Sequence, residues 1–315
     1  MKLSVIVVNW NVAGLLRSCL QSLLQQTAPP PDGWEILVVD NCSSDESVPM
    51  LRAEFPQVRL IENQQNRGFG RANNQAFAAC TGEYVLLLNP DTVVQDRAVS
   101  RLLERMETMP DCGALGCQLL NSDGSFQRWT GGSIPTLGSI ASHYLLLHRF
   151  LPRWMLPSPL YLEHQPEHDL EVGWASGACL LLRREALGGQ LFDERFFLYG
   201  EDLDLCRRIG AGKRWKVIYT PQVSIVHHEG RSLIGSPPEL QDSKLNGLRM
   251  AFASGRGRLS LLAYDALALT GFVLRYTIQC LAAFLPGRND PARRAMLARY
   301  VQTSLQFLVG RGRTS

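Results

Sequence analysis

The chain has 315 residues, of which 45% are hydrophobic and 19% are charged, and its formal net charge is +3. This is an ordinary globular composition, and the length suits one large domain or two smaller ones. The small net charge gives no argument for a nucleic-acid partner. The apolar run at the N-terminus is too short for a signal peptide, and no uninterrupted apolar stretch reaches transmembrane length.

The eight cysteines form no CxxC pair, and most of them lie inside apolar runs. They are Cys19, Cys42, Cys80, Cys112, Cys117, Cys179, Cys206 and Cys280. Thiols in such surroundings behave as small hydrophobic groups. We therefore expect reduced, buried thiols in a cytoplasmic protein, and neither disulfides nor zinc ligands.

The first third of the chain alternates between short apolar runs and amphipathic segments. The apolar runs predict strands buried on both faces, at Leu3–Val8, Glu35–Val39, Val58–Ile61 and Tyr84–Leu88. Helical spacing and capping residues predict helices between them, at Ala13–Gln26, from Ser43 or Ser44 to about Phe55, at Phe69–Cys80 and at Ala98–Met109. This alternation is typical of a doubly wound α/β fold.

Polar or amphipathic residues follow each of these strands. They are Asn9, Trp10 and Asn11, then Asp40 and Asn41, then the segment Asn63–Gly70, and finally Asn89 and Asp91. Ligands of doubly wound sheets bind at the carboxyl ends of the strands, so four such groups on one edge favour a binding site over ordinary solvated loops. The glycines of Asn66–Gly70 also permit close approach of a phosphate at a helix start, although no Walker loop is present.

The middle of the chain is less regular. The segment Ile134–Pro166 carries scattered aromatic residues and prolines, which indicates a mobile or partner-covering segment. Short strands are predicted later, at Cys179–Leu182, Lys216–Tyr219 and Val223–Val226. His227 and His228 follow the last of these strands. Either could supply a nitrogen ligand to a hard divalent cation held by Asp91.

The segment Phe192–Arg208 places carboxylates among aromatic side chains. The four acids are Glu194, Glu201, Asp202 and Asp204. We expect the aromatic run to be buried and a helix to begin at Gly200–Asp202. One interpretation is a helix start decorated with acids that the helix dipole favours. The other is a general base whose pKa is raised by an apolar wall.

The segment Leu259–Leu285 is apolar with helical spacing, interrupted by Asp265 and Arg275. Basic residues flank it, at Arg256, Arg258, Arg288, Arg293 and Arg294. The pattern predicts either a core-packing helix pair or an amphipathic element on an anionic membrane surface. In the second case we expect peripheral attachment, because charges inside the run make a full span costly.

Seven motifs, in order along the chain, resemble those of glycosyltransferase family 2. They are SVIVVNWN at Ser4–Asn11, VVDNCSSD at Val38–Asp45, NRGFGRANN at Asn66–Asn74, LLLNPD at Leu86–Asp91, GWASGACLLLRR at Gly173–Arg184, FDERFFLYGEDLDLCRR at Phe192–Arg208 and HHEGRS at His227–Ser232. The resemblance implies a GT-A fold, Rossmann-like with a mostly parallel central sheet. The NWN, NPD and FLYGEDLDLC pieces are most similar to the bacterial rhamnosyltransferase-type branch, which builds surface polysaccharides.

On the nucleotide side, the resemblance carries roles onto five residues. Asp40 would hydrogen-bond the nucleotide base, and Asn9 and Trp10 would line the base pocket. Gly68 and Asn74 would lie near the ribose and phosphates.

Around the diphosphate, Asp91 matches the last acid of the DxD motif and would hold Mg²⁺ or Mn²⁺. Asn89 stands in place of the first acid, so the motif has one acidic ligand fewer than usual. His227 would be a further metal or phosphate contact, with His228 as the alternative.

Asp202 matches the catalytic base of the family, with Glu201 beside it. The implied reaction is an inverting, single displacement from a nucleoside-diphosphate sugar to a growing, lipid-linked surface polysaccharide. Rhamnose on deoxythymidine diphosphate is the favoured donor, followed by UDP-sugars. The implied location is cytoplasmic, peripheral at the cytoplasmic face of the inner membrane.

The resemblance also implies a division of the chain. Residues 1–232 would form the GT-A domain, with a donor half of about 1–115 and an acceptor half of about 116–232. Beyond about Leu233 the resemblance is loose. There the apolar segment and its basic flanks predict that residues 233–315 form a C-terminal helical region that could associate with the membrane.

Two other functions are alternatives on the same α/β layer. A nucleotidyltransferase that makes the activated sugar usually has a Gly-rich, basic loop after the first strand, where this chain has Asn9–Asn11. A non-catalytic nucleotide-sugar-binding protein would not need Asp40, Asp91 and Asp202 together. A dehydrogenase is disfavoured because no GxGxxG motif follows the first strand.

Overall fold

The computed structural model describes residues 2–26, 29–30, 32–228, 238–284 and 290–309. The chain divides into two compact units. Unit 1 comprises Met1–Gly132 and Tyr161–Ser236, and unit 2 comprises Ser133–Leu160 and Pro237–Ser315. The predicted division into folding domains at residue 232 stays a prediction.

Unit 1 contains a nine-stranded mixed sheet and a two-stranded one. The large sheet consists of β1 (Leu3–Asn9), β2 (Trp34–Asp40), β3 (Arg59–Glu62), β4 (Tyr84–Leu88), β5 (Thr92–Val93), β6 (Cys112–Leu120), β8 (Leu170–Glu171), β10 (Cys179–Arg183) and β11 (Lys216–His227). The small sheet pairs β7 (Gly131–Gly132) with β9 (Trp174–Ala175). The helices of unit 1 are α1 (Ala13–Gln26), α2 (Ser47–Glu54), α3 (Phe69–Ala79), α4 (Ala98–Thr108), the 3-10 turn η3 (Arg184–Leu187) and α6 (Glu201–Ala211).

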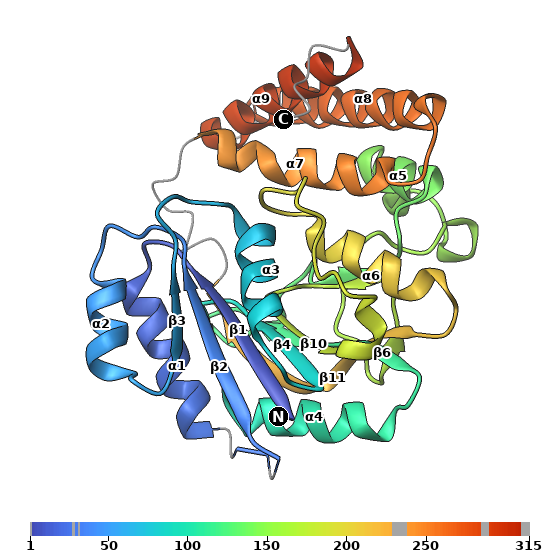
Figure 1. Ribbon diagram of the computed structural model, residues 1–315. Coiled ribbons are helices and arrows are strands. Elements are labelled where there is room, and N and C mark those ends of the chain that lie inside the picture. The colour runs from blue at the N-terminus through green and yellow to red at the C-terminus, as the bar shows by residue number, and fades with distance from the viewer. Residues whose placement is uncertain (1, 27–28, 31, 229–237, 285–289, 310–315) are drawn as a thin grey trace. The chain divides into compact units, whose positions relative to one another are not determined.

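The strands of the large sheet lie in the order β3-β2-β1-β4-β10-β6-β11-β5, with β8 paired to β11 (Figure 1). β1 is parallel to both β2 and β4, β2 is parallel to β3, and β6 is parallel to β11. Every residue of β1 and β4 is buried, as expected for strands covered on both faces. The α/β class with a mostly parallel sheet is therefore confirmed.

The second half of the sheet differs from the prediction. β10 runs antiparallel to both of its neighbours, β4 and β6, and β6 itself was not predicted. β11 is one continuous strand where two were expected. Its pairing with β6 shifts register between Thr220 and Ser224, around Pro221. Because proline has no N–H to donate to the neighbouring strand, Pro221 produces a β-bulge there, and β11 continues beyond it.

The predicted start of α2 at Ser43 or Ser44 is wrong. The helix begins at Ser47, whose backbone N–H and hydroxyl donate to Asp45 Oδ1 at 3.0 and 2.5 Å. Ser43 Oγ instead accepts from the backbone N–H of Asn11 at 2.9 Å. Ser43, which the sequence suggested as a helix cap, therefore bonds the residues at the end of β1.

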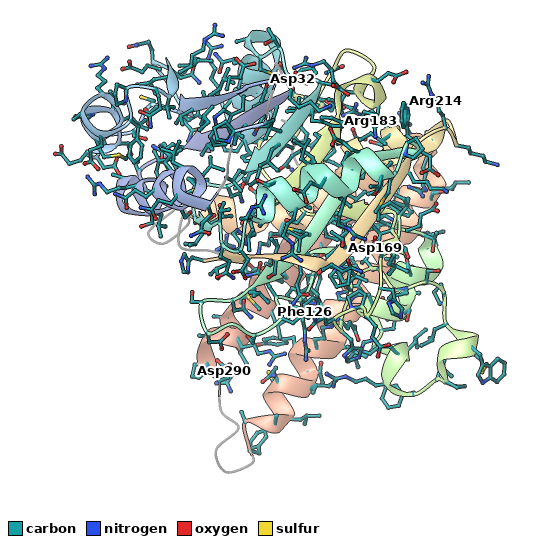
Figure 2. All side chains as sticks on the ribbon, turned by 90° about the horizontal axis from the view of Figure 1, so that it is seen from below. Asp32, Phe126, Asp169, Arg183, Arg214 and Asp290 are labelled. Carbon is teal, nitrogen blue, oxygen red and sulfur yellow. The ribbon has the colours of Figure 1, made fainter. Side chains whose placement is uncertain are left out.

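Arg183 ties the end of β10 to the end of α4 (Figure 2). Its guanidinium donates to the carbonyls of Met106 and Met109 at 3.0 and 3.2 Å, and to the carbonyl of Cys112 at 3.1 Å. Carbonyls at a helix end have no partner inside the helix, so an arginine at this position satisfies them. These bonds hold the carboxyl end of β10 at the edge of the sheet opposite the site described below.

All eight cysteine sulfurs are free, as expected. Six are buried, but Cys42 is exposed and Cys280 is half-buried. The prediction of buried thiols is thus wrong at Cys42, which lies in the polar loop after β2.

Unit 2 is helical. It contains α5 (Leu137–Tyr144), the 3-10 turns η1 (Leu147–Arg149) and η2 (Arg153–Met155), α7 (Pro238–Ala253), α8 (Arg258–Ala282) and α9 (Pro291–Leu308). A mobile or partner-covering segment was predicted over Ile134–Pro166, and within it Thr136 and Ser139 form a capping box at the start of α5. α8 packs closely against it, because a Cβ at Gly271 would lie only 2.6 Å from Tyr144 Cβ. The segment thus contains a regular helix packed on α8, and its mobility stays a prediction.

α8 is long and apolar enough, by length and composition alone, to cross a membrane. Its Asp265 is 2% exposed and forms an ion pair with Arg249 of α7, at 2.7 and 2.8 Å. A buried carboxylate paired to a neighbouring helix indicates a helix packed within unit 2.

Candidate active site

Several strands bring polar residues to one edge of the large sheet. Asn9 at the end of β1 lies opposite Asp40 at the end of β2. Because β10 is antiparallel, its first residue, Cys179, lies opposite Leu88 at the end of β4. The end of β11 reaches the same edge, where His227 pairs with β5, the short strand after β4. The expected gathering of strand-end residues is present in the sheet.

Asp40 and Asn9 lie buried side by side, with exposed fractions of 2% and 0%. Asn9 Nδ2 donates to Asp40 Oδ1 at 2.9 Å and to Ser43 Oγ at 3.1 Å. The backbone N–H of Ser43 donates to Asp40 Oδ2 at 2.9 Å. Both carboxylate oxygens are thus oriented and keep spare lone pairs, while Asn9 Oδ1 is buried with no partner among the described residues. Trp10, the other predicted pocket residue, follows and is half-buried.

Gly68 lies where the chain before α3 meets the segment before α6. Its φ is +80°, and a Cβ would lie 2.8 Å from both Cδ2 and the carbonyl oxygen of Phe197. Both facts require glycine. The backbone N–H groups of Arg67 and Gly68 already donate to the side chains of Asn41 and Asn66, at 3.0 and 2.9 Å. A phosphate contact at this helix start therefore stays a prediction.

Asn74 of α3 holds the backbone of Phe192. Its Nδ2 donates to the Phe192 carbonyl and its Oδ1 accepts from the Phe192 N–H, each at 2.9 Å. This pair of bonds gives Asn74 a positioning role, and its predicted nucleotide contact stays a prediction. Phe192 and Phe196 are buried as expected, whereas Phe197 is 48% exposed, so the prediction of a fully buried aromatic run is wrong there.

Asp91 and His227 face each other, with Asp91 Oδ1 3.3 Å from His227 Nε2. Gln127 Oε1 lies 2.7 Å from His227 Nδ1, and Gln127 Nε2 donates to the His227 carbonyl at 3.2 Å. Because the amide oxygen can only accept, Nδ1 is the ring nitrogen that carries the proton. In the neutral ring, the Nε2 lone pair then points toward Asp91 Oδ1.

This geometry fits a divalent cation. The oxygens Asp91 Oδ1 and Asn89 Oδ1 are buried and have no hydrogen-bond partner in the part of the chain that the structure describes. Facing lone pairs on oxygen and nitrogen repel, and either a proton on Nε2 or a divalent cation between the two atoms would remove that repulsion. Among the described residues, no three His, Cys, Asp or Glu side chains gather to hold a metal. Phosphate oxygens would have to complete the coordination.

The two candidate histidines have different partners. His227 faces Asp91, whereas His228 Nδ1 lies 2.6 Å from Ser122 Oγ. This favours His227 for the predicted role. The rest of the HHEGRS motif, Glu229–Ser232, lies outside the described residues.

Glu201 and Asp202 open α6 after Gly200, whose φ is +88°. Asp202 Oδ1 accepts from the N–H of Leu203 at 2.8 Å and Oδ2 accepts from the N–H of Gly177 at 3.2 Å. Glu201 is 5% exposed, and its Oε2 has no partner among the described residues. Burial raises the pKa of both carboxyls. The charge of Asp202 raises the pKa of Glu201 further, whereas the two N–H groups lower that of Asp202. The pKa of Glu201 is thus raised to about 8, whereas the N–H donors around Asp202 favour its charged form.

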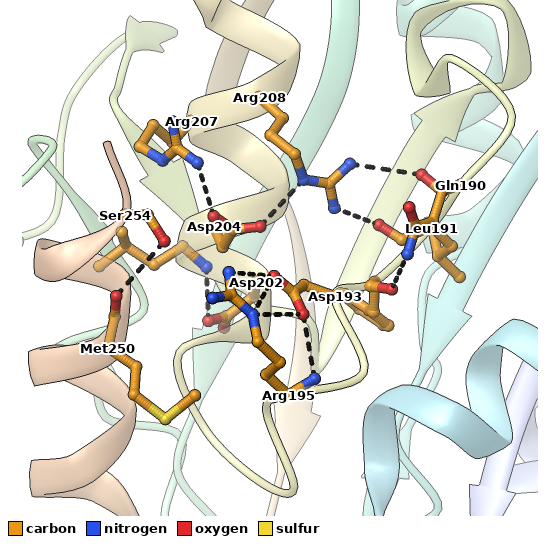
Figure 3. A network of polar contacts seen from close by, with 12 residues as sticks. Gln190, Leu191, Asp193, Arg195, Asp202, Asp204, Arg207, Arg208, Met250 and Ser254 are labelled. Carbon is orange, nitrogen blue, oxygen red and sulfur yellow. Dashed lines mark hydrogen bonds and ion pairs between the residues drawn. The ribbon is translucent and has the colours of Figure 1, made fainter. Parts of the chain in front are cut away.

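Asp204, a third acid of the same turn, is occupied by structural ion pairs (Figure 3). Its oxygens accept from Arg207 at 2.8 Å and from Arg208 at 2.9 Å. Arg208 also donates to the carbonyls of Gln190 and Leu191, before the aromatic run. Asp204 thus orients Arg208, which holds this segment against α6, and Asp204 is not available as a base.

Three residues of this site were missed by the sequence analysis: Ser43, Gln127 and Gly177. Ser43 had been assigned to a helix cap. Gly177 lies within the GWASGAC stretch, but its N–H reaches Asp202 only because β10 runs antiparallel to β4. Gln127 lies in no motif, and nothing in the sequence relates it to His227.

The chain was compared with known families and proteins. The profile of Glycosyl transferase family 2 matches residues 4–189. An N-acetylglucosaminyl-diphospho-decaprenol L-rhamnosyltransferase of Mycobacterium tuberculosis is 32% identical over 243 residues, which cover 73% of this chain and 77% of that protein. The O-antigen biosynthesis protein RfbC of Myxococcus xanthus is 33% identical over 238 residues, which cover 73% of this chain but 18% of that larger protein.

Two solved structures share the fold. The mannosyltransferase PcManGT from Pyrobaculum calidifontis, in complex with GDP-Man and Mn²⁺, has a TM-score of 0.54 at 19% identity, covering 98% of this chain and 87% of its own. S. aureus TarS has a TM-score of 0.52 at 14% identity, covering 96% of this chain and 55% of its own. At these identities the likeness supports the GT-A fold alone.

We predict that Glu201→Gln flattens the pH dependence of stability. A raised pKa means that the folded state binds the Glu201 proton more tightly than the unfolded chain. The free energy of unfolding therefore falls as pH rises above about 4.3, the ordinary range of glutamate. Glutamine cannot ionise, so the variant should gain roughly 1–3 kcal/mol over wild type between about pH 5 and about pH 8 in urea denaturation. The control Glu104→Gln, at an exposed glutamate, should show no such gain. An equal stability difference for Glu201→Gln at both pH values would contradict the prediction.

Proposed function

The chain belongs to Glycosyl transferase family 2 and is an inverting glycosyltransferase, and we propose that it transfers a rhamnose-type sugar from deoxythymidine diphosphate to a lipid-linked N-acetylglucosaminyl diphosphate acceptor. The donor sugar and acceptor follow the name of the Mycobacterium tuberculosis relative. The observation that carries the proposal is the convergence of Asp40, the Asp91–His227 pair and Asp202 on one sheet edge. This arrangement supports a single site in which binding groups for a nucleotide and a base for an acceptor hydroxyl would lie together.

Asp40 and Asn9 would recognise the nucleotide base. Asp40 is held rigid by Asn9 and by the N–H of Ser43, so its remaining lone pairs have a defined direction. A pyrimidine ring presents an N–H beside carbonyl oxygens, and a fixed carboxylate accepts from it. Trp10, the half-buried residue after Asn9, would offer an aromatic face to the base.

Asp91 Oδ1 and His227 Nε2 would hold Mg²⁺ or Mn²⁺ together with the diphosphate oxygens. When bound, such a cation offsets the charge that develops on the departing nucleoside diphosphate. Gln127 keeps His227 in the tautomer that leaves Nε2 free to bind. The presence of Mn²⁺ in the Pyrobaculum calidifontis structure supports metal use on this fold.

Asp202 would take the proton from the acceptor hydroxyl as that oxygen attacks the anomeric carbon. The N–H groups of Gly177 and Leu203 orient its carboxylate. The raised pKa of Glu201, about 8, favours its neutral form, so Glu201 would place little second charge next to Asp202. The attack and the departure occur on opposite faces of the sugar, so the anomeric configuration inverts.

Unit 2 would attach the enzyme to the cytoplasmic face of the membrane that carries its acceptor. It contains 13 Lys and Arg residues against four Asp and Glu residues, whereas unit 1 contains 19 against 25. Large apolar side chains are exposed on or just after α8, at Leu259, Leu262, Val273, Leu274, Ile278, Leu281 and Phe284. Basic charge attracts anionic lipid, and the apolar side chains add a salt-insensitive contribution. The buried Asp265–Arg249 pair favours peripheral attachment over a span.

We predict that Asp202→Asn lowers turnover by roughly 10²–10⁴-fold, the usual effect of losing a general base. The amide keeps the size and can still accept one N–H, so nucleotide affinity should stay within about twofold. Sugar transfer from deoxythymidine-diphosphate-rhamnose to an N-acetylglucosaminyl diphosphate acceptor measures this directly. Glu194→Gln is the matched control at an exposed acid of the same segment. Near-normal turnover of Asp202→Asn would remove Asp202 from the role of base.

We predict that Asp91→Ala abolishes the effect of Mn²⁺ on nucleoside diphosphate binding. Calorimetric titration of wild type should show tighter binding with Mn²⁺ than with chelator, while the variant should give one weak affinity in both. Asp123→Ala, at an exposed acid on a turn, should behave as wild type. Metal-independent binding by wild type would show that the assigned metal role is wrong.

We predict that Leu281→Glu combined with Phe284→Glu weakens binding to anionic vesicles at least about tenfold, because two of the most exposed apolar side chains, at 63% and 86%, become charged. Flotation with phosphatidylglycerol and phosphatidylcholine vesicles is the measurement. Gln57→Glu, which adds negative charge at an exposed site of unit 1, should have little effect. Failure of the wild type to bind anionic vesicles at low salt would contradict membrane attachment.

A further inference from the structure

The segment Gln127–Thr130 connects the two sides of the candidate site within unit 1. Gln127 and Thr130 are buried, at 3% and 5%, whereas Arg128 and Trp129 between them are exposed. Gln127 holds His227 on the donor side through the bond to Nδ1. The two exposed side chains therefore project from a segment that is fixed at both ends.

Thr130 is connected to Asp202, the proposed base, through hydrogen bonds. Its carbonyl accepts the N–H of Ser176 at 2.9 Å, and the next residue, Gly177, donates its N–H to Asp202 Oδ2 at 3.2 Å. Two hydrogen bonds and one peptide unit separate Thr130 from Asp202, a span of about 10 Å at most. The backbone of Trp129 is thus one residue away from this path to the Asp202 carboxylate.

Trp129 has two features that packing does not explain. Its side chain is 60% exposed, and its backbone φ is +67°. A left-handed backbone disfavours bulky residues, and asparagine or glycine would adopt it at lower cost. Strain of this kind concentrates at functional positions.

The Trp129 ring is backed by other aromatic rings. Its centroid lies 5.9 Å from that of Tyr161, and Tyr161 meets Trp174 edge to face at 6.0 Å. Trp174 is buried in β9, just before Ser176. The row of rings runs from the exposed Trp129 toward the strand that leads to the base.

We propose that Trp129, backed by Tyr161, is the stacking surface for a sugar ring of the acceptor; this rests on the proposed function. A pyranose ring presents a face of C–H groups to a flat aromatic ring, and the indole N–H can donate to a hydroxyl group. Stacking on a rigid ring fixes the sugar plane and so directs one hydroxyl toward Asp202. Trp129 acts on the acceptor and leaves donor binding to Asp40, Asp91 and His227.

The test compares Trp129→Asn, Trp129→Phe and the control Trp154→Asn. Asparagine removes the ring yet suits the left-handed backbone, phenylalanine keeps a stacking face, and Trp154 is an 83% exposed tryptophan of unit 2. The acceptor probe is N-acetylglucosaminyl diphosphate on a short, water-soluble alkyl chain, so that no membrane is needed. The readouts are the acceptor KM, kcat, the slow hydrolysis of donor without acceptor, and nucleoside diphosphate affinity.

Trp129→Asn should raise the acceptor KM by about tenfold, which corresponds to about 1.4 kcal/mol. Donor hydrolysis and nucleotide affinity should stay within about twofold, Trp129→Phe should recover most of the loss, and Trp154→Asn should match wild type. An unchanged acceptor KM in Trp129→Asn would overturn the proposal. So would an equal loss of donor hydrolysis, which would indicate disturbance of the Gln127–His227 contact. Failure of the proposed function would differ, because wild type itself would then transfer nothing to this probe.

Discussion

The direction of β10 is the constraint on which the site depends. β10 runs antiparallel to β4 and β6, so its amino end lies beside the carboxyl ends of parallel strands. The N–H of Gly177, two residues before β10, can therefore reach Asp202 while Asp91 lies after the neighbouring strand. In a parallel β10 of five residues, that N–H would lie about 16 Å away, at the far edge of the sheet. Arg183 fixes the other end of the strand against α4.

The carboxylates at this edge differ in their surroundings, and these differences separate their chemistry. Asp40 is buried and oriented by Asn9 and Ser43, which suits recognition of a ligand N–H. Asp91 keeps a buried oxygen without a partner among the described residues and faces a histidine nitrogen, which suits a cation. Asp202 accepts two N–H groups that favour its charged form, beside Glu201, whose pKa is raised, and this arrangement suits a base. Burial, donor count and neighbouring charge thus suit similar side chains to the different roles proposed for them.

Sequence patterns within single segments predicted the helices and strands that depend on those segments alone. The apolar runs of β1, β2 and β4 and the helical spacing of α1 and α4 gave the first half of the sheet, and the strand-end rule gathered Asn9, Asp40 and Asp91. The antiparallel course of β10, the bulge of β11 at Pro221 and the bond of Gln127 to His227 depend on pairings between residues far apart in the chain. No local pattern carries that information. The family resemblance added the role of Asp202, which composition and spacing left open between a base and an ordinary helix start.

The stereochemistry of transfer tests the account most directly. With Asp202 on the acceptor side and the diphosphate held by Asp91 and His227, the account requires one displacement through opposite faces of the sugar. The anomeric C–H coupling constant of the newly transferred sugar, measured by NMR before any equilibration, should show the configuration opposite to that of the donor. A product that keeps the donor's configuration would contradict a single displacement with Asp202 as base and would require a different arrangement of the site.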